Sequence, residues 1–145
     1  MKPNQILLDQ SLKIKKCYHK LCIPVCNKHQ ITENELEILL FLHYQAPKYD
    51  SAKAIIEARS MSKSQVCKSI DSLKANGYLQ TTIDQKDRRL IHLALTKKAT
   101  PIIQEGIETR TRLFNLLYQD VSEEDINTLK RIIQQIDKNL EKEMK

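Results

Sequence analysis

One segment in the second half of the chain restricts the fold more than any other part. It reads "SKSQVCKSIDSLKANG" and continues as "YLQTTIDQKDRRLIHLALT". Ser62 is followed three residues later by Gln65, which is the spacing of a capping box at the start of a helix. Asn76-Gly77 supplies the left-handed residue that commonly ends one. We therefore predict a helix over 62–76 that leads directly into a second element.

Two short stretches after this helix, residues 78–83 and 90–95, contain the β-branched and alternating residues of strands. The "DQKDRR" loop between them has no glycine, and all but one of its side chains are charged. Such a loop does not suit a tight two-residue turn. We predict a β-hairpin with a stiff tip, in which Asp84 and Asp87 grip a neighbouring cation through charge-assisted hydrogen bonds. The candidate cations are Lys86, Arg88 and Arg89.

The remainder of the chain predicts helices. Only two glycines and four prolines are present, too few for a turn-rich all-β protein. We expect a helix over 5–29, kinked at Pro24. A second helix opens at a capping box formed by Thr32 and Glu35, and its apolar middle, "LEILLFL", should be buried. Further helices are expected over 51–59, after Thr96 and after Ser122. The expected fold class is mainly α with a small β-hairpin (α+β).

The order of these elements matches a helix-turn-helix followed by a wing. The helix over 62–76 presents basic and hydrogen-bonding groups of the kind that contact base edges and phosphates in the major groove. Arg88 would lie at the apex of the wing, suited to the negative potential of a narrow minor groove. The net charge of +6 and the pI of about 9.1 agree with an anionic partner. We predict that double-stranded DNA is contacted by Lys63, Ser64, Gln65, Lys68, Ser69, Lys86, Arg88 and Arg89.

A series of residues after the predicted helix carries a family likeness. The series consists of Gly77-Tyr78-Leu79, then Asp84, Asp87, Arg88 and Arg89, and then Leu95-Thr96. It resembles the MarR family of bacterial transcription regulators, in which a recognition helix is followed by a Gly-hydrophobic strand start, an Asp-x-x-Asp-Arg-Arg wing and a Leu-Thr pair. The stretch "SAKAIIEAR" departs from the family, which usually shows a Leu-Ala pair there.

The resemblance implies a single protomer over 1–145. Residues 32–95 would form the winged helix-turn-helix DNA-binding lobe, and residues 1–29 and 101–145 the helical dimerisation region. The resemblance also implies that Arg88 enters the minor groove and that an aspartate, Asp84 or Asp87, steadies it.

A homodimer is a further implication, and apolar stripes near both ends of the chain agree with it. A terminal helix with apolar residues at three-four spacing must bury that stripe somewhere. Two recognition helices in a dimer would address half-sites of a pseudo-palindromic operator about one DNA turn apart. The residues expected at the dimer interface are Leu7, Ile14, Leu21, Ile126, Leu129, Ile133, Ile136 and Leu140.

The sequence indicates less about a small-molecule effector than about the DNA-binding residues. The resemblance implies a repressor that binds small, often aromatic, acids and is released by them. Tyr18, His43 and Tyr44 are candidates to line such a cleft, although they suit the core or an interface equally well.

The cysteines leave an alternative open, a metal- or thiol-responsive regulator of the same fold. Cys22 and Cys26 share a helical face with His19 and His29, but a straight helix cannot bring all four to one ion. Cys67 lies beside the inward stripe of the predicted recognition helix, so we expect it to be buried and inert. A winged-helix protein-interaction module without DNA binding is a second alternative. We expect no bound metal and no cofactor.

Enzymatic activity is not expected. No Ser/His/Asp set, glycine-rich phosphate loop or paired-carboxylate pocket is visible. No apolar run approaches the ~18 residues of a membrane span, and charges such as Lys2 and Asp9 leave no signal-peptide run. We therefore expect a cytoplasmic protein whose cysteines are thiols rather than disulfides.

Overall fold

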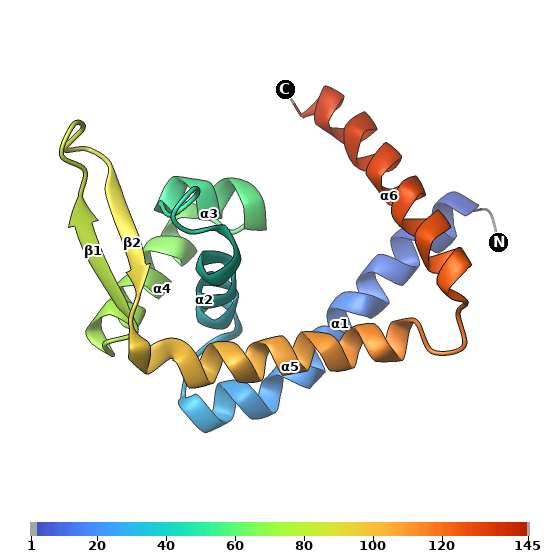
Figure 1. Cartoon of the computed structure of the whole chain (residues 1–145), viewed down its shortest axis with the longest axis horizontal. Helices are drawn as coiled ribbons and strands as arrows, with labels where there is room; N and C mark the ends of the chain where they lie inside the picture. Colours follow the sequence, from blue (N-terminus) through green and yellow to red (C-terminus); the bar gives the residue numbers. More distant parts are fainter. Residues whose placement is uncertain (1–2, 145) are drawn as a thin grey trace. The chain divides into compact units, whose positions relative to one another are not determined.

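The computed structural model describes residues 3–144. Helices and one antiparallel hairpin make up this part of the chain (Figure 1). This confirms the predicted mainly α class with a small β-hairpin. The elements in order are α1 (Pro3–His29), α2 (Glu33–Gln45), α3 (Ala52–Arg59), α4 (Lys63–Ala75), β1 (Leu79–Ile83), β2 (Ile91–Leu95), a short 3-10 turn (Lys97–Ala99), α5 (Thr100–Leu117) and α6 (Glu123–Glu143).

The chain divides into two compact units, Met1–Thr111 and Arg112–Lys145. The first unit contains α1 to β2 and most of α5, and the second contains the end of α5 and all of α6. No helix among residues 3–144 is both long enough and apolar enough to cross a membrane.

The core of the first unit is built around α2. Its apolar side chains from Leu36 to Leu42 are almost completely buried, as the apolar sequence predicts. The helix begins at a complete capping box: Thr32 Oγ1 accepts from the Glu35 amide at 3.1 Å, and Glu35 Oε1 accepts from the Thr32 amide at 3.3 Å. α2 packs against α1, α4 and β2. A helix buried on all sides needs neighbours on all sides, and these elements supply them.

The remaining neighbour is α5, which crosses α2 at a glycine. Gly106 is buried, and a Cβ at this position would lie 3.1 Å from Leu36 Cδ1 and 3.2 Å from both Cδ atoms of Leu40. The missing side chain therefore allows the two helices to approach closely.

Three polar side chains join α1, α2 and α5 inside the first unit. The Tyr18 hydroxyl donates to Glu37 Oε1 at 2.6 Å, and Arg110 donates from Nη2 to Glu37 Oε2 at 2.7 Å and from Nε to the Tyr18 oxygen at 3.2 Å. Burial and the Glu37 hydrogen bond raise the pKa of Tyr18. Tyr18, a candidate ligand contact from the sequence, is thus committed to this network.

Some predicted boundaries shift. α1 continues through Pro24 without interruption of the helix. The long helix expected to begin at Thr96 begins instead at Thr100, after the 3-10 turn. The Thr96 hydroxyl does not cap this turn, because it donates to the Gly77 carbonyl at 2.6 Å. Pro101 then occupies the first turn of α5, where its missing N–H costs nothing.

In the second unit, α6 begins at Ser122, whose hydroxyl accepts from the Asp125 amide at 3.1 Å. The helix has one apolar stripe, formed by Ile126, Leu129, Ile133, Ile136 and Leu140, and no residue of α6 is buried within the chain. Leu129, Ile133 and Leu140 are 39%, 51% and 55% exposed.

The close crossing of α5 over α2 predicts a coupled stability effect. Gly106→Val should destabilise the fold by about 1–3 kcal/mol, because the new side chain overpacks the core. Leu36→Ala alone should cost about 2–5 kcal/mol by opening a cavity. Combined, the two substitutions should cost about 0.5–3 kcal/mol less than their sum, because the valine fills that cavity. Urea unfolding of the four proteins measures the coupling, and strictly additive values would contradict the crossing.

Candidate nucleic-acid interface

The pair formed by α3 and α4 is a helix-turn-helix. The Ser51 hydroxyl starts α3 by accepting from the Ala54 amide at 3.2 Å. α3 ends at Ser60 in the left-handed conformation, with φ 53°. After one further residue, Ser62 and Gln65 form the predicted capping box of α4. The two helices pack against one another, and the β1–β2 hairpin follows as a wing.

The faces of α4 are distinct. Its buried residues are Val66, Ser69, Ile70 and Leu73, spaced three and four apart. The expectation that Ser69 faces outward is therefore wrong, because it lies on the inward stripe with 7% of its surface exposed. The residues of the predicted set that are exposed on α4 are Lys63, Ser64, Gln65 and Lys68.

A contact that sequence reasoning missed fixes α4 to α2. The Ser72 hydroxyl donates to Glu35 Oε2 at 3.1 Å, while the other oxygen of Glu35 completes the cap of α2. Glu35 is 6% exposed, so both of its oxygens are satisfied inside the protein. Glu35 was recognisable as a capping residue, but its second partner lies far along the chain and left no local signal.

The connection from α4 to the wing is also tightly held. Gly77 has φ 81°, the left-handed position predicted from the Asn-Gly pair. The Tyr78 amide donates back to the Leu73 carbonyl at 2.9 Å, which satisfies a carbonyl at the helix end. Lys98 donates to the Asn76 carbonyl at 2.7 Å and lies 5.0 Å from the Tyr78 ring centroid. The start of β1 is therefore anchored at the end of α4.

The wing pairs its two strands in one antiparallel register, from Leu79 opposite Leu95 to Ile83 opposite Ile91. Strand boundaries are one residue shorter at their starts than the predicted 78–83 and 90–95. Leu79 and Leu93 are buried against the core, so the hairpin is fixed at its base while its tip projects.

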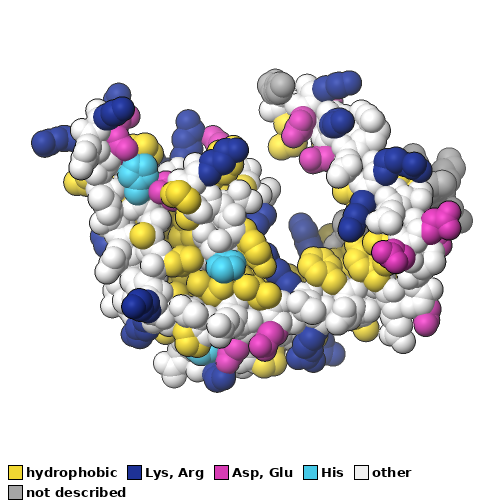
Figure 2. Space-filling view, viewed as in Figure 1, with side chains coloured by type: hydrophobic (Ala, Val, Ile, Leu, Met, Phe, Trp, Pro, Cys, Tyr) yellow, Lys and Arg dark blue, Asp and Glu magenta, His cyan; other side chains and the backbone are white. Residues whose placement is uncertain are grey.

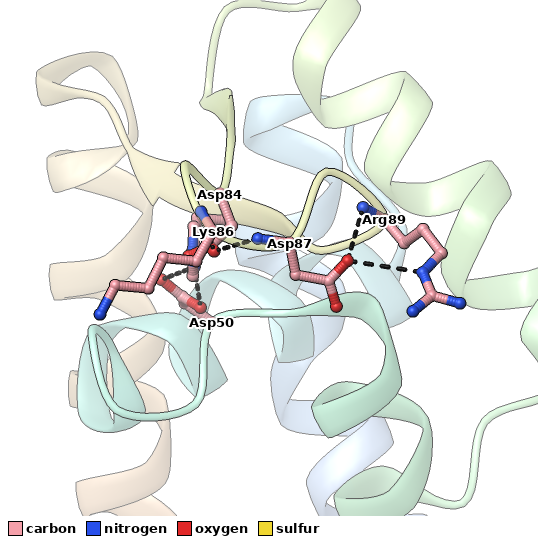
Figure 3. A network of polar contacts seen from close by, with 6 residues as sticks. Asp50, Asp84, Lys86, Asp87 and Arg89 are labelled. Atoms are coloured by element: carbon pink, nitrogen blue, oxygen red, sulfur yellow. Dashed lines mark hydrogen bonds and ion pairs between the residues drawn. The ribbon is translucent and has the colours of Figure 1, made fainter.

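The tip is held by its two aspartates (Figure 3). Asp84 Oδ2 accepts from the backbone amides of Lys86 and Asp87 at 2.9 and 2.8 Å. Asp87 Oδ1 accepts from the Arg89 amide at 3.0 Å and from Arg89 Nε at 3.5 Å. Charged side chains of both signs gather at this end of the hairpin (Figure 2).

This bracing differs in its partners from the expectation. Asp84 holds backbone amides rather than a cation, and Asp87 holds Arg89. Within residues 3–144, the Arg88 guanidinium makes no hydrogen bond or ion pair with another residue. The loop backbone is fixed, and exposed Lys86, Arg88 and Arg89 project from it.

His92, which sequence reasoning also missed, joins the wing to the segment before α3. Its Nδ1 lies 2.9 Å from Asp50 Oδ1, and its Nε2 lies 2.7 Å from Asp84 Oδ1. The hydrogen bond that the His92 ring makes to Asp84, followed by the one to Asp50, raises the pKa of His92. The His92 contact, followed by the two backbone amides, lowers the pKa of Asp84.

The cysteines do not behave as one group. Cys67 is exposed on α4, so the expectation that it is buried is wrong: it lies one position past the buried stripe. Cys22 is buried, and burial raises its pKa to about 11. Burial also raises the pKa of Cys26. Since the thiolate is the nucleophile and the metal ligand, both groups are less reactive than ordinary thiols. Among the described residues, no three His, Cys, Asp or Glu side chains are arranged to hold a metal ion.

A helix-turn-helix with exposed basic and amide groups on its second helix, followed by a rigid cationic wing, suits binding to a nucleic-acid duplex. Comparison with known proteins agrees with this geometry. A sequence model described as the MarR family matches residues 29–90, the span from the end of α1 to the wing. This part of the chain is similar to the MarR family.

Two transcriptional regulators resemble this chain in sequence. The HTH-type transcriptional regulator PecS of Dickeya dadantii is 25% identical over 117 residues, which cover 80% of this chain and 70% of that protein. The transcriptional regulator AdcR of Streptococcus pneumoniae is 29% identical over 116 residues, which cover 80% and 77%.

Solved structures show the same fold. A MarR protein from Peptoclostridium difficile superposes with a TM-score of 0.80 at 16% identity, over 94% of this chain and 88% of that one. Staphylococcus aureus MarR, in complex with salicylate and kanamycin, gives 0.77 at 21% identity over 96% and 93%. The S. aureus MepR–DNA complex gives 0.75 at 14% identity over 96% and 98%. These likenesses confirm the MarR winged-helix fold.

Proposed function

We propose that this chain is a MarR-family regulator that binds a specific operator in double-stranded DNA as a homodimer, with α4 in the major groove and the β1–β2 wing at the minor groove. One observation carries the proposal: an exposed polar and basic helix face and a braced cationic loop belong to the same compact unit. Both are anchored to the same core, through Val66 and Leu73 of α4 and Leu79 and Leu93 of the hairpin.

The exposed residues of α4 suit this role. Lys63, Ser64 and Gln65 occupy its first turn and Lys68 the next, and the N-terminal residues of a recognition helix are the ones that contact base edges. Lysines supply phosphate contacts, and the hydroxyl and amide groups supply hydrogen bonds. Ser69 is left out of this set, because it is buried.

Arg88 is the best candidate for the minor groove. Its guanidinium has no partner among the described residues, while Asp84 and Asp87 hold the loop backbone on either side. A pre-ordered loop loses less conformational entropy on binding than a mobile one. The solved S. aureus MepR–DNA complex has the same fold, which supports DNA as the partner of this chain.

Arg88→Ala should weaken operator binding by about 1–3 kcal/mol, because one groove cation is lost. The operator is first selected from a random DNA pool, and affinity is then measured at several salt concentrations. The matched control is Arg131→Ala, which removes the same charge from an exposed site on α6 and should leave affinity nearly unchanged. Equal affinity and equal salt slope for Arg88→Ala and the native protein would remove the wing from the mechanism.

The homodimer is supported by apolar surface that a single chain leaves uncovered. Leu7 and Ile14 of α1 are 60% and 38% exposed. The α6 stripe is uncovered within its own unit. Soluble proteins rarely leave apolar stripes of this length open to water, and a second copy of the chain would cover them. A dimer occupying promoter DNA would exclude other proteins from it, which is why we propose repression.

Ile133→Glu should disrupt the dimer, because a carboxylate would be buried without a partner in the apolar interface. The dimer dissociation constant should rise by a factor of roughly 30, about 2 kcal/mol, or more. Sedimentation equilibrium measures it. Gln134→Glu adds the same charge to the neighbouring position, off the stripe, and should keep the native constant. A dimer of unchanged strength in Ile133→Glu would contradict the assigned interface.

We also propose that a small aromatic acid regulates the protein. An open cavity of about 320 Å³ lies between α2, β2 and the start of α5. His43 lines it, with the Tyr44 ring packed edge-on against the His43 ring at 4.9 Å. Lys97 is the cation at its wall. S. aureus MarR, which shares the fold, has been solved with salicylate.

Calorimetric titration with salicylate tests this site. The native protein should give saturable heat, and Lys97→Ala should weaken binding by about 1 kcal/mol or more, because a charge-assisted contact to the carboxylate is lost. Lys86→Ala, a lysine of the wing tip, is the control and should bind as the native protein does. No saturable heat at millimolar salicylate, or equal binding by Lys97→Ala, would contradict the assignment.

A further inference from the structure

His92 makes contacts that only a charged imidazole can satisfy. Each ring nitrogen faces a carboxylate: Nδ1 lies 2.9 and 3.1 Å from the two oxygens of Asp50, and Nε2 lies 2.7 Å from Asp84 Oδ1. A neutral imidazole has one N–H and one lone pair. Its lone pair would therefore point at an ionised carboxylate, whereas the imidazolium donates to both.

These contacts join three separate segments of the DNA-binding lobe. Asp50 directly precedes Ser51, the N-cap of α3, and its carbonyl also accepts from the Leu93 amide at 2.8 Å. Asp84 uses Oδ1 for His92 and Oδ2 for the amides that shape the wing tip. Figure 3 shows Asp50 close to the loop that carries Asp84. The ring thus links the helix-turn-helix to the wing.

We propose that His92 is a positioning residue for DNA binding, whose imidazolium holds the Asp84-centred wing loop against the segment that starts α3, so that affinity for DNA depends on one proton in each protomer. This inference rests on the proposed DNA-binding function. His92 itself acts through the wing and need not touch the nucleic acid.

The charged groups around the His92 ring determine which of its protonation states is favoured. Asp50, before α3, and Asp84, at the end of β1, face it, and Lys86 and Asp87 lie on the same loop. Within residues 3–144, no Lys or Arg forms an ion pair with Asp50 or Asp84. The geometry therefore favours the protonated ring, in agreement with the raised pKa of His92.

The raised pKa of His92 determines how DNA affinity should change with pH. Below its raised pKa, His92 is charged and both contacts are made. As pH rises through that pKa, one contact becomes repulsive and the wing loses its tie to the α3 segment. DNA phosphates near the wing favour the charged form further, so binding takes up a proton. Affinity should therefore fall with rising pH, by up to about tenfold per protomer for a pKa difference of 1 between the bound and unbound protein.

The test is the pH profile of affinity for the selected operator at constant salt, in four full-length proteins. The native protein should show the fall. His92→Gln should bind weakly at all pH values without a step, because the glutamine cannot donate to both carboxylates. Asp50→Asn should retain the acid-pH affinity at alkaline pH, because the asparagine amide can donate to a neutral ring whose other nitrogen still donates to Asp84.

The matched control is His19→Gln. His19 also pairs with a carboxylate, Glu33, but on α1 and α2 rather than in the wing, so the native profile should persist. A merely structural role for His92 would weaken binding in His92→Gln without the rescue at alkaline pH in Asp50→Asn. NMR titration of the His92 ring supplies a second readout, in which operator DNA should raise its pKa.

The outcomes separate the two proposals. No salt-dependent DNA binding at any pH would overturn the proposed function and this inference with it. DNA binding whose pH profile is the same in the native protein, His92→Gln and Asp50→Asn would overturn this inference alone. If His92→Gln does not give a native circular dichroism spectrum, Asp50→Asn and the NMR titration still test the inference. An Asp50→Asn pH profile of affinity equal to the native one, together with a His92 pKa that DNA leaves unchanged, would overturn the inference.

Discussion

The complete burial of one apolar helix is the constraint from which the first unit follows. α2 has almost no exposed side chain between Leu36 and Leu42, so α1, α4, β2 and α5 must enclose it. The close approach of α5 depends on the absence of a side chain at Gly106. The carboxylates of α2 are satisfied as well: Glu35 by its cap and Ser72, and Glu37 by Tyr18 and Arg110. Hydrophobic enclosure and polar pairing thus position α4 together.

The wing is ordered mainly by hydrogen bonds to carboxylates rather than by burial of apolar side chains. It has few buried side chains, and its tip has none, so hydrophobic burial cannot order it. Carboxylates do so instead, by accepting backbone amides inside the loop and by contacting His92. A loop ordered this way can present Lys86 and Arg88 outward, while Arg89 contacts Asp87. Surface charge pairs are weak singly, but Asp84 and Asp87 also accept hydrogen bonds from three backbone amides of the loop.

The exposed apolar residues of α1 and α6 bear on the proposed dimer. Neither the apolar residues of α1 between Ile6 and Ile14 nor the α6 stripe is buried within its own unit, in contrast to the enclosed apolar residues of α2. Burial inside a lobe builds the DNA-binding surface, and apolar surface left uncovered is what a paired molecule requires. The same sequence therefore divides its hydrophobic residues between folding and proposed assembly.

Local pattern determined much of this protein. The caps at Thr32, Ser62 and Ser122, the helix stop at Gly77 and the hairpin all depend on residues close together in the sequence, and the structure contains each of them. The alternating charges of "DQKDRR" also indicated a braced tip. Short-range hydrogen bonds and helical or strand periodicity are enough to specify such features.

Only the tertiary structure decided which distant groups meet. The prediction of Ser69 as a DNA contact was wrong, although helical spacing from Val66 and Leu73 could have shown that it is buried. The Glu35–Ser72 and Tyr18–Glu37–Arg110 contacts depended on the folded helices. In the sequence, His92 is an ordinary residue of a predicted strand. Its contact with Asp50, which is distant in the sequence, exists only in the folded protein. Side-chain pairing across the core depends on how elements pack in space, and a sequence pattern describes one element at a time.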